Sequence, residues 1–227
     1  MTQVSSRNPR TGQVEDRVGE ETSPRELEQV CSLAAAAGAD IRYTDRAVRA
    51  ALLRTMAREL DSGRDEIIAT ADRETALGVG RLAGELTRTC YQLGLFADLL
   101  DEGSYLEATV DHAGDTPMGP RPDLRRMLVP VGPVAVFGAS NFPLAFSVPG
   151  GDTAAAVAAG CPVIVKAHPS HPATSMMCHQ LLSRAVARGG LARGVIQLVY
   201  GQDVGTALVA HQSVQAAAFT GSHSGAR

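Results

Sequence analysis

The chain has 227 residues, of which 44% are hydrophobic and 20% are charged, with a formal net charge of −3; this is the composition of one globular domain or two small ones. The negative charge, the absence of Trp and an aromatic content of 4% disfavour a nucleic-acid-binding surface. No apolar run has the length of a membrane span, and the polar start lacks a signal-peptide pattern. Its four cysteines have no paired spacing, which predicts reduced thiols and a cytoplasmic protein.

The first hundred residues are expected to be helical after a loose polar segment over 1–22. Ser23, Pro24 and Glu26 have the pattern of a helix start, with a capping serine, a proline in the first turn and a glutamate three residues after the cap. Thr44 is expected to cap the second helix. Apolar periodicity predicts helices over 24–37, 45–60, 64–77 and 81–100. Glu74 and Glu85 are interpreted as solvated positions on these helices.

Residues 101–128 change in character. Asp, Gly, Pro and Thr are frequent there, and residues 105–111 alternate weakly between apolar and polar. This pattern predicts an irregular hairpin that bridges two parts of the molecule.

From Val129 onward, short apolar strands alternate with helices. Both faces of each strand are apolar, as a buried parallel sheet requires, so the fold class is α/β with a Rossmann-like parallel sheet and flanking helices. Sheets of this kind bind ligands beyond the carboxyl ends of their strands. The expected strands are 131–137, 163–166, 195–199 and 215–219, and the expected helices are 151–160, 173–189 and 203–210.

The loop after the first of these strands combines small residues with an amide. Ala139 and Ser140 would let a ligand approach the backbone. Asn141 would place an amide donor where it can stabilise a developing oxyanion. The alternative is that Asn141 caps a turn before Pro143.

Lys166, the last residue of the second of these strands, is the single lysine beside 20 arginines. A compact ammonium there, together with His168, could contact ribose hydroxyls and a phosphate. His168 and His171 could instead hold a metal, but their loose spacing and the lack of a nearby carboxylate or thiol disfavour this.

Glycines follow the third and fourth strands. Gly201 is assigned to the same cofactor site. Gly221 and Ser222 form a turn that could offer backbone N–H groups to a pyrophosphate.

Three of these motifs, in this order, resemble the NAD(P)-dependent aldehyde dehydrogenase superfamily. The segments 140–143, 163–166 and 219–222 are similar to its Asn-Phe-Pro motif, its lysine-ending strand and its Phe-Thr-Gly-Ser turn. Further segments resemble its 2,5-dioxovalerate (α-ketoglutaric semialdehyde) branch: 72–77, 81–89, 122–127 and 137–147. The resemblance implies oxidation of 2,5-dioxopentanoate to 2-oxoglutarate, and homo-oligomers of the full-length protein.

The resemblance also implies a division of the chain into three parts. Residues 1–100 would be the N-terminal helical part of the coenzyme domain. Residues 101–128 would be a bridging hairpin of the oligomerisation region, and residues 129–227 a partial dinucleotide-binding domain. Asn141 would hold the substrate oxygen, Lys166 the adenosine ribose, and Gly221 with Ser222 the pyrophosphate.

Two departures from the family pattern affect what we expect of coenzyme binding. Pro169 stands where many NAD-preferring members carry a glutamate that binds both ribose hydroxyls. Because a missing carboxylate removes repulsion against a 2′-phosphate, we expect NADP to be preferred, with NAD as the alternative. Ala226 replaces a second glycine of the pyrophosphate turn, which affects how closely helix and strand approach.

The family's nucleophilic Cys and general-base Glu lie downstream of the Phe-Thr-Gly-Ser turn, beyond Arg227. We therefore expect this chain to be the N-terminal portion of such an enzyme, with Asn141 as its one catalytic residue and no dehydrogenase activity on its own. The alternative is a non-catalytic nucleotide-binding module that acts through a partner chain.

Overall fold

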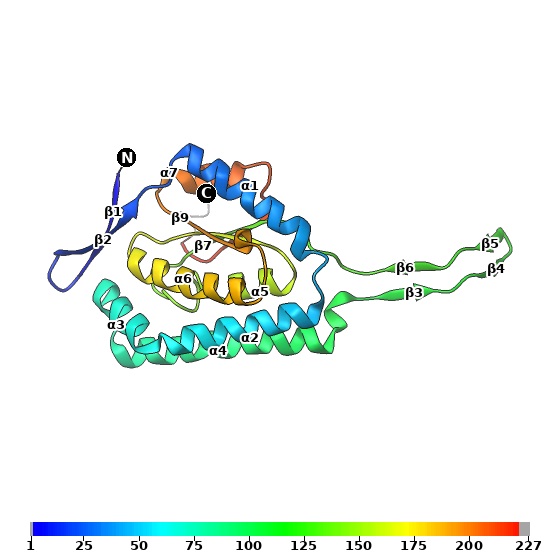
Figure 1. The fold of residues 1–227 in the computed structure, drawn as a ribbon, viewed down its shortest axis with the longest axis horizontal. Coiled ribbons are helices and arrows are strands. Elements are labelled where there is room, and N and C mark those ends of the chain that lie inside the picture. The colour runs from blue at the N-terminus through cyan, green and yellow to red at the C-terminus, as the bar shows by residue number, and fades with distance from the viewer. Residues whose placement is uncertain (1, 223–227) are drawn as a thin grey trace.

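A four-stranded parallel sheet lies at the centre of the molecule in the computed structural model, which describes residues 2–222 (Figure 1). The strand order is β10-β7-β8-β9, and every pairing is parallel. The α/β fold class expected from the sequence is therefore confirmed. The strands are β7 (Val134–Phe137), β8 (Val163–Lys166), β9 (Ile196–Val199) and β10 (Ala216–Phe219).

Alternate residues of the central strands enter two different cores. On β8, Val163 and Val165 belong to the larger core, whereas Ile164 belongs to the smaller one. Successive side chains of a strand point to opposite faces of a sheet. Both faces of β8 are thus buried, which explains its unbroken apolar sequence.

Helices cover both faces of the sheet in layers (Figure 1). One face is covered by α1 and α7, and the other by α5 and α6, over which α2, α3 and α4 form an outer layer. Two short 3₁₀ turns, Ser104–Leu106 and Arg193–Val195, complete the described elements. The helices are α1 (Pro24–Ile41), α2 (Arg46–Ser62), α3 (Arg64–Thr75), α4 (Val79–Glu102), α5 (Gly151–Ala158), α6 (Pro172–Arg188) and α7 (Asp203–Ala210).

The first helix starts as its sequence predicts, and the second starts one residue later than expected. Ser23 caps α1 in a full capping box with Glu26. For α2 the cap is Asp45, whose carboxylate accepts from the Ala47 N–H at 2.7 Å. The Thr44 hydroxyl instead donates to the Asp40 carbonyl at 3.3 Å, so it is not free to cap α2.

The expectation of a loose segment over 1–22 is wrong. β1 (Gln3–Arg7) and β2 (Val14–Glu20) form an antiparallel hairpin, which packs against α6 and, through β1, α3. Main-chain pairing holds these polar residues, and such pairing leaves no apolar signal in the sequence. The segment after the hairpin is bonded to the end of β9: the Thr22 N–H donates to the Tyr200 carbonyl at 2.9 Å, and the Tyr200 N–H donates to Thr22 Oγ1 at 3.0 Å.

Glu74 is buried, contrary to the solvated position expected for it. Its carboxylate accepts from the Ala173 N–H at 2.9 Å and from both the N–H and the hydroxyl of Thr174, at 2.8 and 2.7 Å. These donors belong to the first turn of α6, whose N–H groups have no partner within the helix. Glu74 therefore caps α6 from the end of α3.

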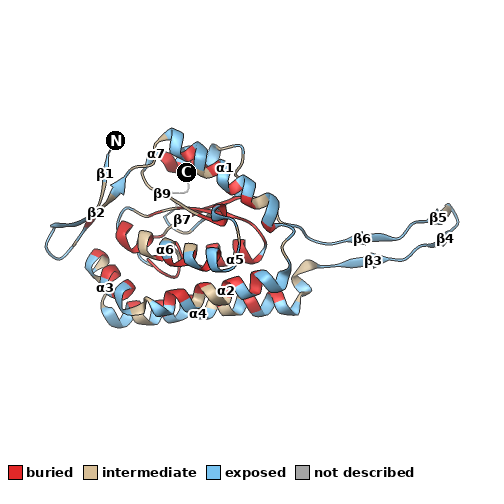
Figure 2. Cartoon of the chain, in the orientation of Figure 1, coloured by how far each residue is buried: buried red, intermediate tan, exposed pale blue. Residues whose placement is uncertain are grey.

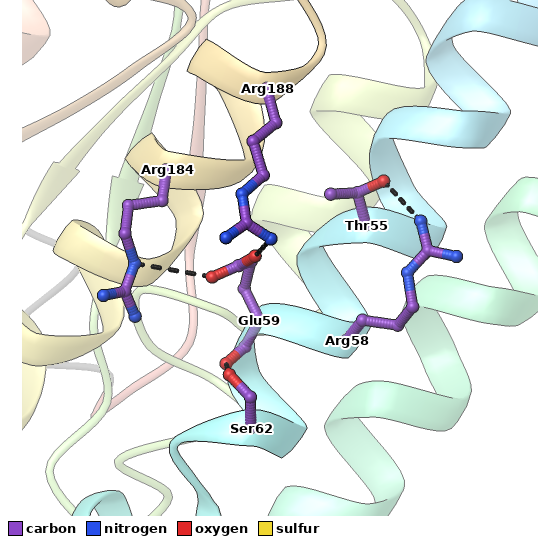
Figure 3. Close-up of a pocket in the computed structure, with 6 residues that line it drawn as sticks. All are labelled: Thr55, Arg58, Glu59, Ser62, Arg184 and Arg188. Atoms are coloured by element: carbon purple, nitrogen blue, oxygen red, sulfur yellow. Dashed lines mark hydrogen bonds and ion pairs between the residues drawn. The ribbon is translucent and has the colours of Figure 1, made fainter.

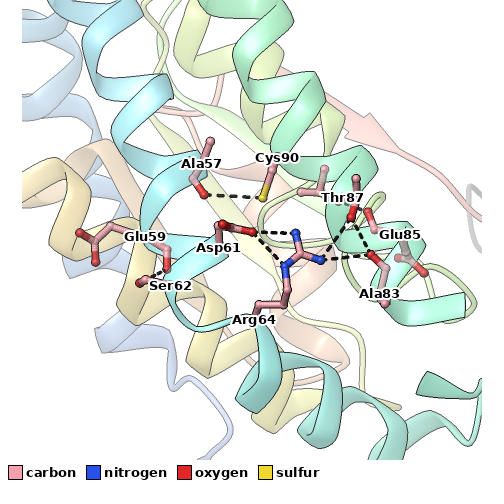
Figure 4. A network of polar contacts seen from close by, with 10 residues as sticks. Ala57, Glu59, Asp61, Ser62, Arg64, Ala83, Glu85, Thr87 and Cys90 are labelled. Carbon is pink, nitrogen blue, oxygen red and sulfur yellow. Dashed lines mark hydrogen bonds and ion pairs between the residues drawn. The ribbon is translucent and has the colours of Figure 1, made fainter. Parts of the chain in front are cut away.

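A polar network joins the turn between α2 and α3 to α4 (Figure 4). Arg64 forms an ion pair with Asp61 at 2.7 Å and donates to Thr87 Oγ1 at 3.2 Å and to the Ala83 carbonyl at 3.4 Å. The Cys90 thiol points at the Ala57 carbonyl at 3.6 Å. The network fixes the three outer helices relative to one another.

The hairpin expected within 101–128 forms a long arm that projects from the globular part (Figures 1 and 2). Its pairs are β3 (Thr109–Asp111) with β6 (Leu124–Arg126), and β4 (Gly114–Thr116) with β5 (Gly119–Arg121). Nearly every residue of the arm is exposed. Two-stranded ribbons without a packed face have little stability of their own.

Among the described helices, none combines the length and the apolar character that crossing a membrane requires.

Candidate functional site

A cavity of about 340 Å³ lies at the carboxyl ends of β7, β8 and β10. It is open on one side and is bounded by the loops after these strands and by the first turn of α7. The residues that line it are Phe137, Gly138, Ala139, Ser140, Lys166, His168, Pro169, Gln202, Gly205, Thr206, Phe219, Thr220, Gly221 and Ser222.

Strand register brings these loops to one place. Phe137 on β7 lies opposite both Lys166 on β8 and Phe219 on β10. The rings of Phe137 and Phe219 are tilted against each other with centroids 6.0 Å apart. Because the three strands end level, their loops open into one crevice, which is the usual ligand site of such sheets. Of the residues assigned to a cofactor site from the sequence, the cavity brings together Ala139, Ser140, Lys166, His168, Gly221 and Ser222.

Lys166 is half-buried at the edge of the cavity. Burial lowers the pKa of its ammonium group, and the negative charge of Glu21 acts in the opposite direction. A partly desolvated cation interacts more strongly with a ligand's oxygens than a fully hydrated one.

His168 offers the cavity a hydrogen-bond donor rather than a charge. Burial lowers its pKa to about 4, with smaller contributions from His171 and Lys166, so its ring is neutral at pH 7. The Ser170 N–H donates to its Nδ1 at 3.2 Å, which places the ring proton on Nε2. A contact from His168 to a ribose or a phosphate, as the sequence suggests, would therefore be a hydrogen bond from a neutral ring in the free protein.

His171 has a structural role under the cavity. It is fully buried, its Nε2–H donates to the Ala139 carbonyl at 2.8 Å, and its Nδ1 lies 3.3 Å from the Ser175 hydroxyl. Burial lowers its pKa. These bonds hold the backbone of the cavity-lining residue Ala139. Within residues 2–222, no group of three or more His, Cys, Asp or Glu is arranged to hold a metal ion.

Asn141 directly follows the cavity-lining Ser140 but lies outside the lining itself, and its side chain is exposed. Arg81 of α4 donates to the Asn141 carbonyl oxygen. The same guanidinium lies over the ring of Phe142, 4.9 Å from its centroid. Asn141 is thus held through its backbone, and its side-chain amide makes no hydrogen bond to any other residue of the segment 2–222.

Glu85 anchors the same loop from below, so the solvated position expected for it is also wrong. It is buried, and one of its carboxylate oxygens accepts from the N–H groups of Leu144 and Ala145 at 2.7 and 2.8 Å. Arg81 and Glu85 are four residues apart and therefore lie on one face of α4. That face fixes the segment that carries Asn141.

Gly201 lies beside the cavity rather than in its lining. It has φ +116°, a conformation that favours glycine, and it lines a neighbouring hollow of about 200 Å³. A side chain at Gly201 would lie 3.2–3.3 Å from the side chain of Glu21.

Three cavity residues were missed from the sequence: Gln202, Gly205 and Thr206. The available signal was a glycine inside the predicted helix 203–210. A Cβ at Gly205 would lie 3.3 Å from the Phe137 ring and 4.0 Å from Lys166 Cε. Glycine there keeps α7 close to the strand ends and leaves room for a ligand.

The turn after β10 contributes Gly221 and Ser222 to the lining. A Cβ at Gly221 would lie 2.6 Å from the Phe219 ring, so only glycine fits without a shift. The residues that follow, including the Ala226 discussed above, lie outside the described residues.

None of the four cysteines, all within the described residues, lines the cavity. Cys31, Cys161 and Cys178 are buried, and Cys90 is partly so. Burial raises the pKa of Cys31 and of Cys90 to about 11 and also raises that of Cys178. These thiols are poor nucleophiles at neutral pH.

A larger hollow of about 660 Å³ lies between α2 and α6, away from the strand ends (Figure 3). Its centre is the buried carboxylate of Glu59, which pairs with Arg188 and, at 3.4 Å, with Arg184. Arg58 donates to the Thr55 hydroxyl on the same helix, α2. The two arginines neutralise a buried charge between helices, which accounts for the cluster as a structural contact.

The small residues, the single ammonium and the level strand ends fit a dinucleotide coenzyme. Gly138 lets the end of β7 pack against buried Ser147, since a Cβ there would meet the Ser147 hydroxyl at 2.7 Å. The volume is within the range of ligand pockets. A metal-dependent site does not fit, because His171 is committed to the backbone and His168 has no carboxylate or thiol beside it among the described lining residues.

Comparison with known proteins agrees with this fit. The sequence profile described as "Aldehyde dehydrogenase family" matches residues 1–227. Alpha-ketoglutaric semialdehyde dehydrogenase 2 of Azospirillum brasilense is 50% identical over 204 residues, covering 88% of this chain and 39% of that protein. Alpha-ketoglutaric semialdehyde dehydrogenase of Acinetobacter baylyi is 43% identical over 201 residues, covering 88% and 38%. The chain thus spans less than half the length of these relatives.

Solved structures share the fold over a similar span. An NAD-dependent benzaldehyde dehydrogenase from Corynebacterium glutamicum superposes with a TM-score of 0.80 at 25% identity, covering 96% of this chain and 45% of that one. A glyceraldehyde-3-phosphate dehydrogenase, GapN, from Methanocaldococcus jannaschii complexed with NADP superposes with a TM-score of 0.79 at 18% identity, covering 98% and 46%. The second likeness concerns the fold alone.

Proposed function

Because this chain belongs to the aldehyde dehydrogenase family, we propose that its cavity binds a nicotinamide dinucleotide for the oxidation of an aldehyde. The observation that carries this proposal is the meeting of the β7, β8 and β10 loops around Lys166 in one cavity. When bound, the coenzyme supplies the hydride acceptor.

The chain's own residues would bind the coenzyme as follows. Lys166 donates to ribose or phosphate oxygens with a partly desolvated ammonium. Gly221 and Ser222 offer backbone N–H groups to the pyrophosphate. Gly205 lets α7 pack close to Phe137 and leaves the side of the cavity next to Lys166 without a side chain of its own.

We propose NADP as the favoured form of the coenzyme, with NAD also accepted. Among the described residues of the lining, Lys166 is the one cation at neutral pH, and Pro169 contributes no carboxylate. A phosphate bound near His168 would favour the protonated ring and so strengthen its own binding.

The substrate we propose is an acidic semialdehyde, 2,5-dioxopentanoate, with 2-oxoglutarate as its product. The names of the two curated relatives support this choice. Two arginines of α4 support it further: the guanidinium of Arg81, which binds the Asn141 carbonyl, lies 4.9 Å from the Phe142 ring centroid, and that of Arg88 lies 4.9 Å from the Phe146 ring centroid. Both arginines are exposed, so their remaining N–H groups can meet a carboxylate.

In this proposal Asn141 holds the aldehyde oxygen as it becomes an oxyanion, through its side-chain amide. Arg81 and Glu85 position Asn141 by binding the backbone of its loop. A thiolate nucleophile is not supplied by Cys31, Cys90, Cys161 or Cys178, which are all away from the cavity.

The position of the four cysteines away from the cavity also favours a second candidate function. This is a nucleotide-binding module that acts through a partner chain. One experiment separates binding from catalysis. NADPH titrated into the purified chain should bind, and an assay of NADP reduction with an aldehyde should show no turnover by residues 1–227 alone. Failure to bind either coenzyme would refute the site, whereas aldehyde-dependent NADPH formation would refute the assignment of roles.

A further inference from the structure

A second hollow adjoins the coenzyme cavity and reaches a carboxylate from the other end of the chain. The hollow of about 200 Å³ shares Lys166, Pro169 and Gln202 with the cavity. Its far side is formed by the N-terminal hairpin and by Glu21. The two spaces therefore adjoin at Lys166, Pro169 and Gln202.

Glu21 is held in place by main-chain bonds on both of its sides. Its own N–H donates to the Thr2 carbonyl at 2.9 Å, and the next residue, Thr22, is bonded twice to Tyr200. The side chain is half-buried. The backbone position of Glu21 is thus set by the hairpin and by the end of β9.

Gly201 makes room for this carboxylate. A Cβ at Gly201 would lie 3.3 Å from Glu21 Cδ and 3.2 Å from its Cβ. Glycine at this point lets Glu21 lie flat against the backbone that follows β9. Gly201 would therefore affect the coenzyme indirectly, by leaving room for the side chain of Glu21.

Within residues 2–222, Glu21 is the charged side chain that acts on Lys166. Its negative charge opposes the lowering of the Lys166 pKa by burial. The other basic side chain of the cavity, His168, is neutral at pH 7. The end of the site nearest Lys166 therefore combines one positive and one negative charge.

We propose that Glu21 is a selectivity residue for the coenzyme: its carboxylate accepts hydrogen bonds from ribose hydroxyls beside Lys166 and repels a 2′-phosphate there. This inference rests on the proposed function. A ribose with two hydroxyls satisfies both Lys166 and Glu21, whereas a 2′-phosphate satisfies Lys166 alone. Glu21 thus limits the preference for NADP and keeps NAD acceptable.

The test compares dissociation constants of NADPH and NADH for the wild-type chain and for Glu21→Gln. Removing the charge should tighten NADPH relative to NADH by about tenfold, because like charges at short range in a partly buried site repel by an amount of this order. Glu20→Gln is the matched control: it removes the same charge from an exposed neighbouring position on β2. For this control, the ratio of the NADPH to the NADH dissociation constant should stay within about twofold of the wild-type ratio.

Glu21→Asp keeps the charge on a shorter side chain and should also keep the wild-type ratio. Far-UV circular dichroism of each variant checks that it is folded. An unchanged ratio in a folded Glu21→Gln, or an equal shift in Glu20→Gln, would overturn the inference while leaving the proposed function intact. Absence of binding of both coenzymes to the wild-type chain would overturn both.

Discussion

Lys166 combines two properties that are hard to obtain together: it is a cation, and it ends a strand whose other residues are fully buried. Lys166→Met keeps a long side chain and removes the charge. We expect NADPH binding to weaken by about tenfold to a hundredfold, since a hydrogen bond from a charged group contributes about 1.5–3 kcal/mol. Titration followed by the fluorescence of the reduced coenzyme measures this directly, and the chain has no Trp to interfere.

Arg193→Met is the control for that variant, because Arg193 is an exposed cation outside the cavity. Its affinity for NADPH should match wild type. Equal loss in both variants would show that Lys166 contributes only to the overall charge of the protein.

Individual residues differ in how far the sequence predicts them. Lys166 and Gly221 could be selected because each stands at the end of an apolar strand with an uncommon residue choice. Gln202 and Thr206 could not, because polar residues in the first turn of a helix are ordinary. Glu74 was assigned to solvent because most helix carboxylates are solvated, and its partners lie about a hundred residues further along the chain.

At the scale of elements, the cap that α3 supplies to α6 can be tested by Glu74→Ala. The variant leaves the donors of Ala173 and Thr174 buried without a partner. We expect the free energy of unfolding to fall by about 2–4 kcal/mol, the cost of such unpaired buried donors. Urea denaturation followed by circular dichroism measures this change.

Glu66→Ala, on the exposed side of α3, is the comparison for the cap. Its loss should stay below about 0.5 kcal/mol, as for most surface substitutions. If the two variants lose the same stability, the bonds from Glu74 to α6 contribute nothing measurable.

Among the elements, β8 (Val163–Lys166) and α7 (Asp203–Ala210) have the bounds predicted from the sequence. Their signals are local: an apolar run between turns, and a periodic segment between glycine and a polar loop. The hairpin of β1 and β2 has no such signal, because its residues are mostly polar and its pairing is made by the backbone. β7 begins at Val134 rather than at Val131 because Gly132, at φ +124°, and Pro133 interrupt the strand.

At the scale of the whole molecule, three buried or half-buried histidines make stability depend on pH. Burial lowers the pKa of His168 to about 4 and lowers the pKa values of His171 and His179 from 6.5. Between these lowered pKa values and the ordinary value of 6.5, the unfolded chain binds more protons than the folded one. The free energy of unfolding therefore rises with pH over this range. We expect the urea midpoint to fall as the pH is lowered from 7 to 5.

His171→Gln keeps a donor for the Ala139 carbonyl and removes one titrating group, so it should flatten this dependence. His112→Gln replaces a histidine whose side chain is 83% exposed and should leave the slope unchanged. A midpoint that stays constant from pH 7 to 5 in the wild type would contradict the assignment of neutral buried rings.

The projecting arm and the last strand expose apolar side chains over a wide surface. Val110 and Leu124 on the arm are 50% and 51% exposed, and Phe219 on β10 is 42% exposed. Exposed edges and apolar patches promote association. We expect the chain to elute from size-exclusion chromatography, with light scattering, as species larger than its 23.7 kDa.

The double variant Val110→Thr with Leu124→Thr should shift that elution toward the monomer, whereas Tyr91→Ser, at an exposed position on α4, should not. A wild-type chain that runs as a uniform 23.7 kDa species would contradict this expectation. The assignment of the arm to oligomerisation remains a prediction until then.

Buried cysteines on the two sides of the sheet can be used to follow how the protein unfolds. Cys31, on the inner side of α1, belongs to the smaller core, and Cys178, on the inner side of α6, belongs to the larger core. A thiol reagent can reach either group only when the helix that carries it separates from its core. Labelling rates at the two positions, separated by mass spectrometry of peptides, would therefore report whether the two sides of the sheet come apart together or one before the other.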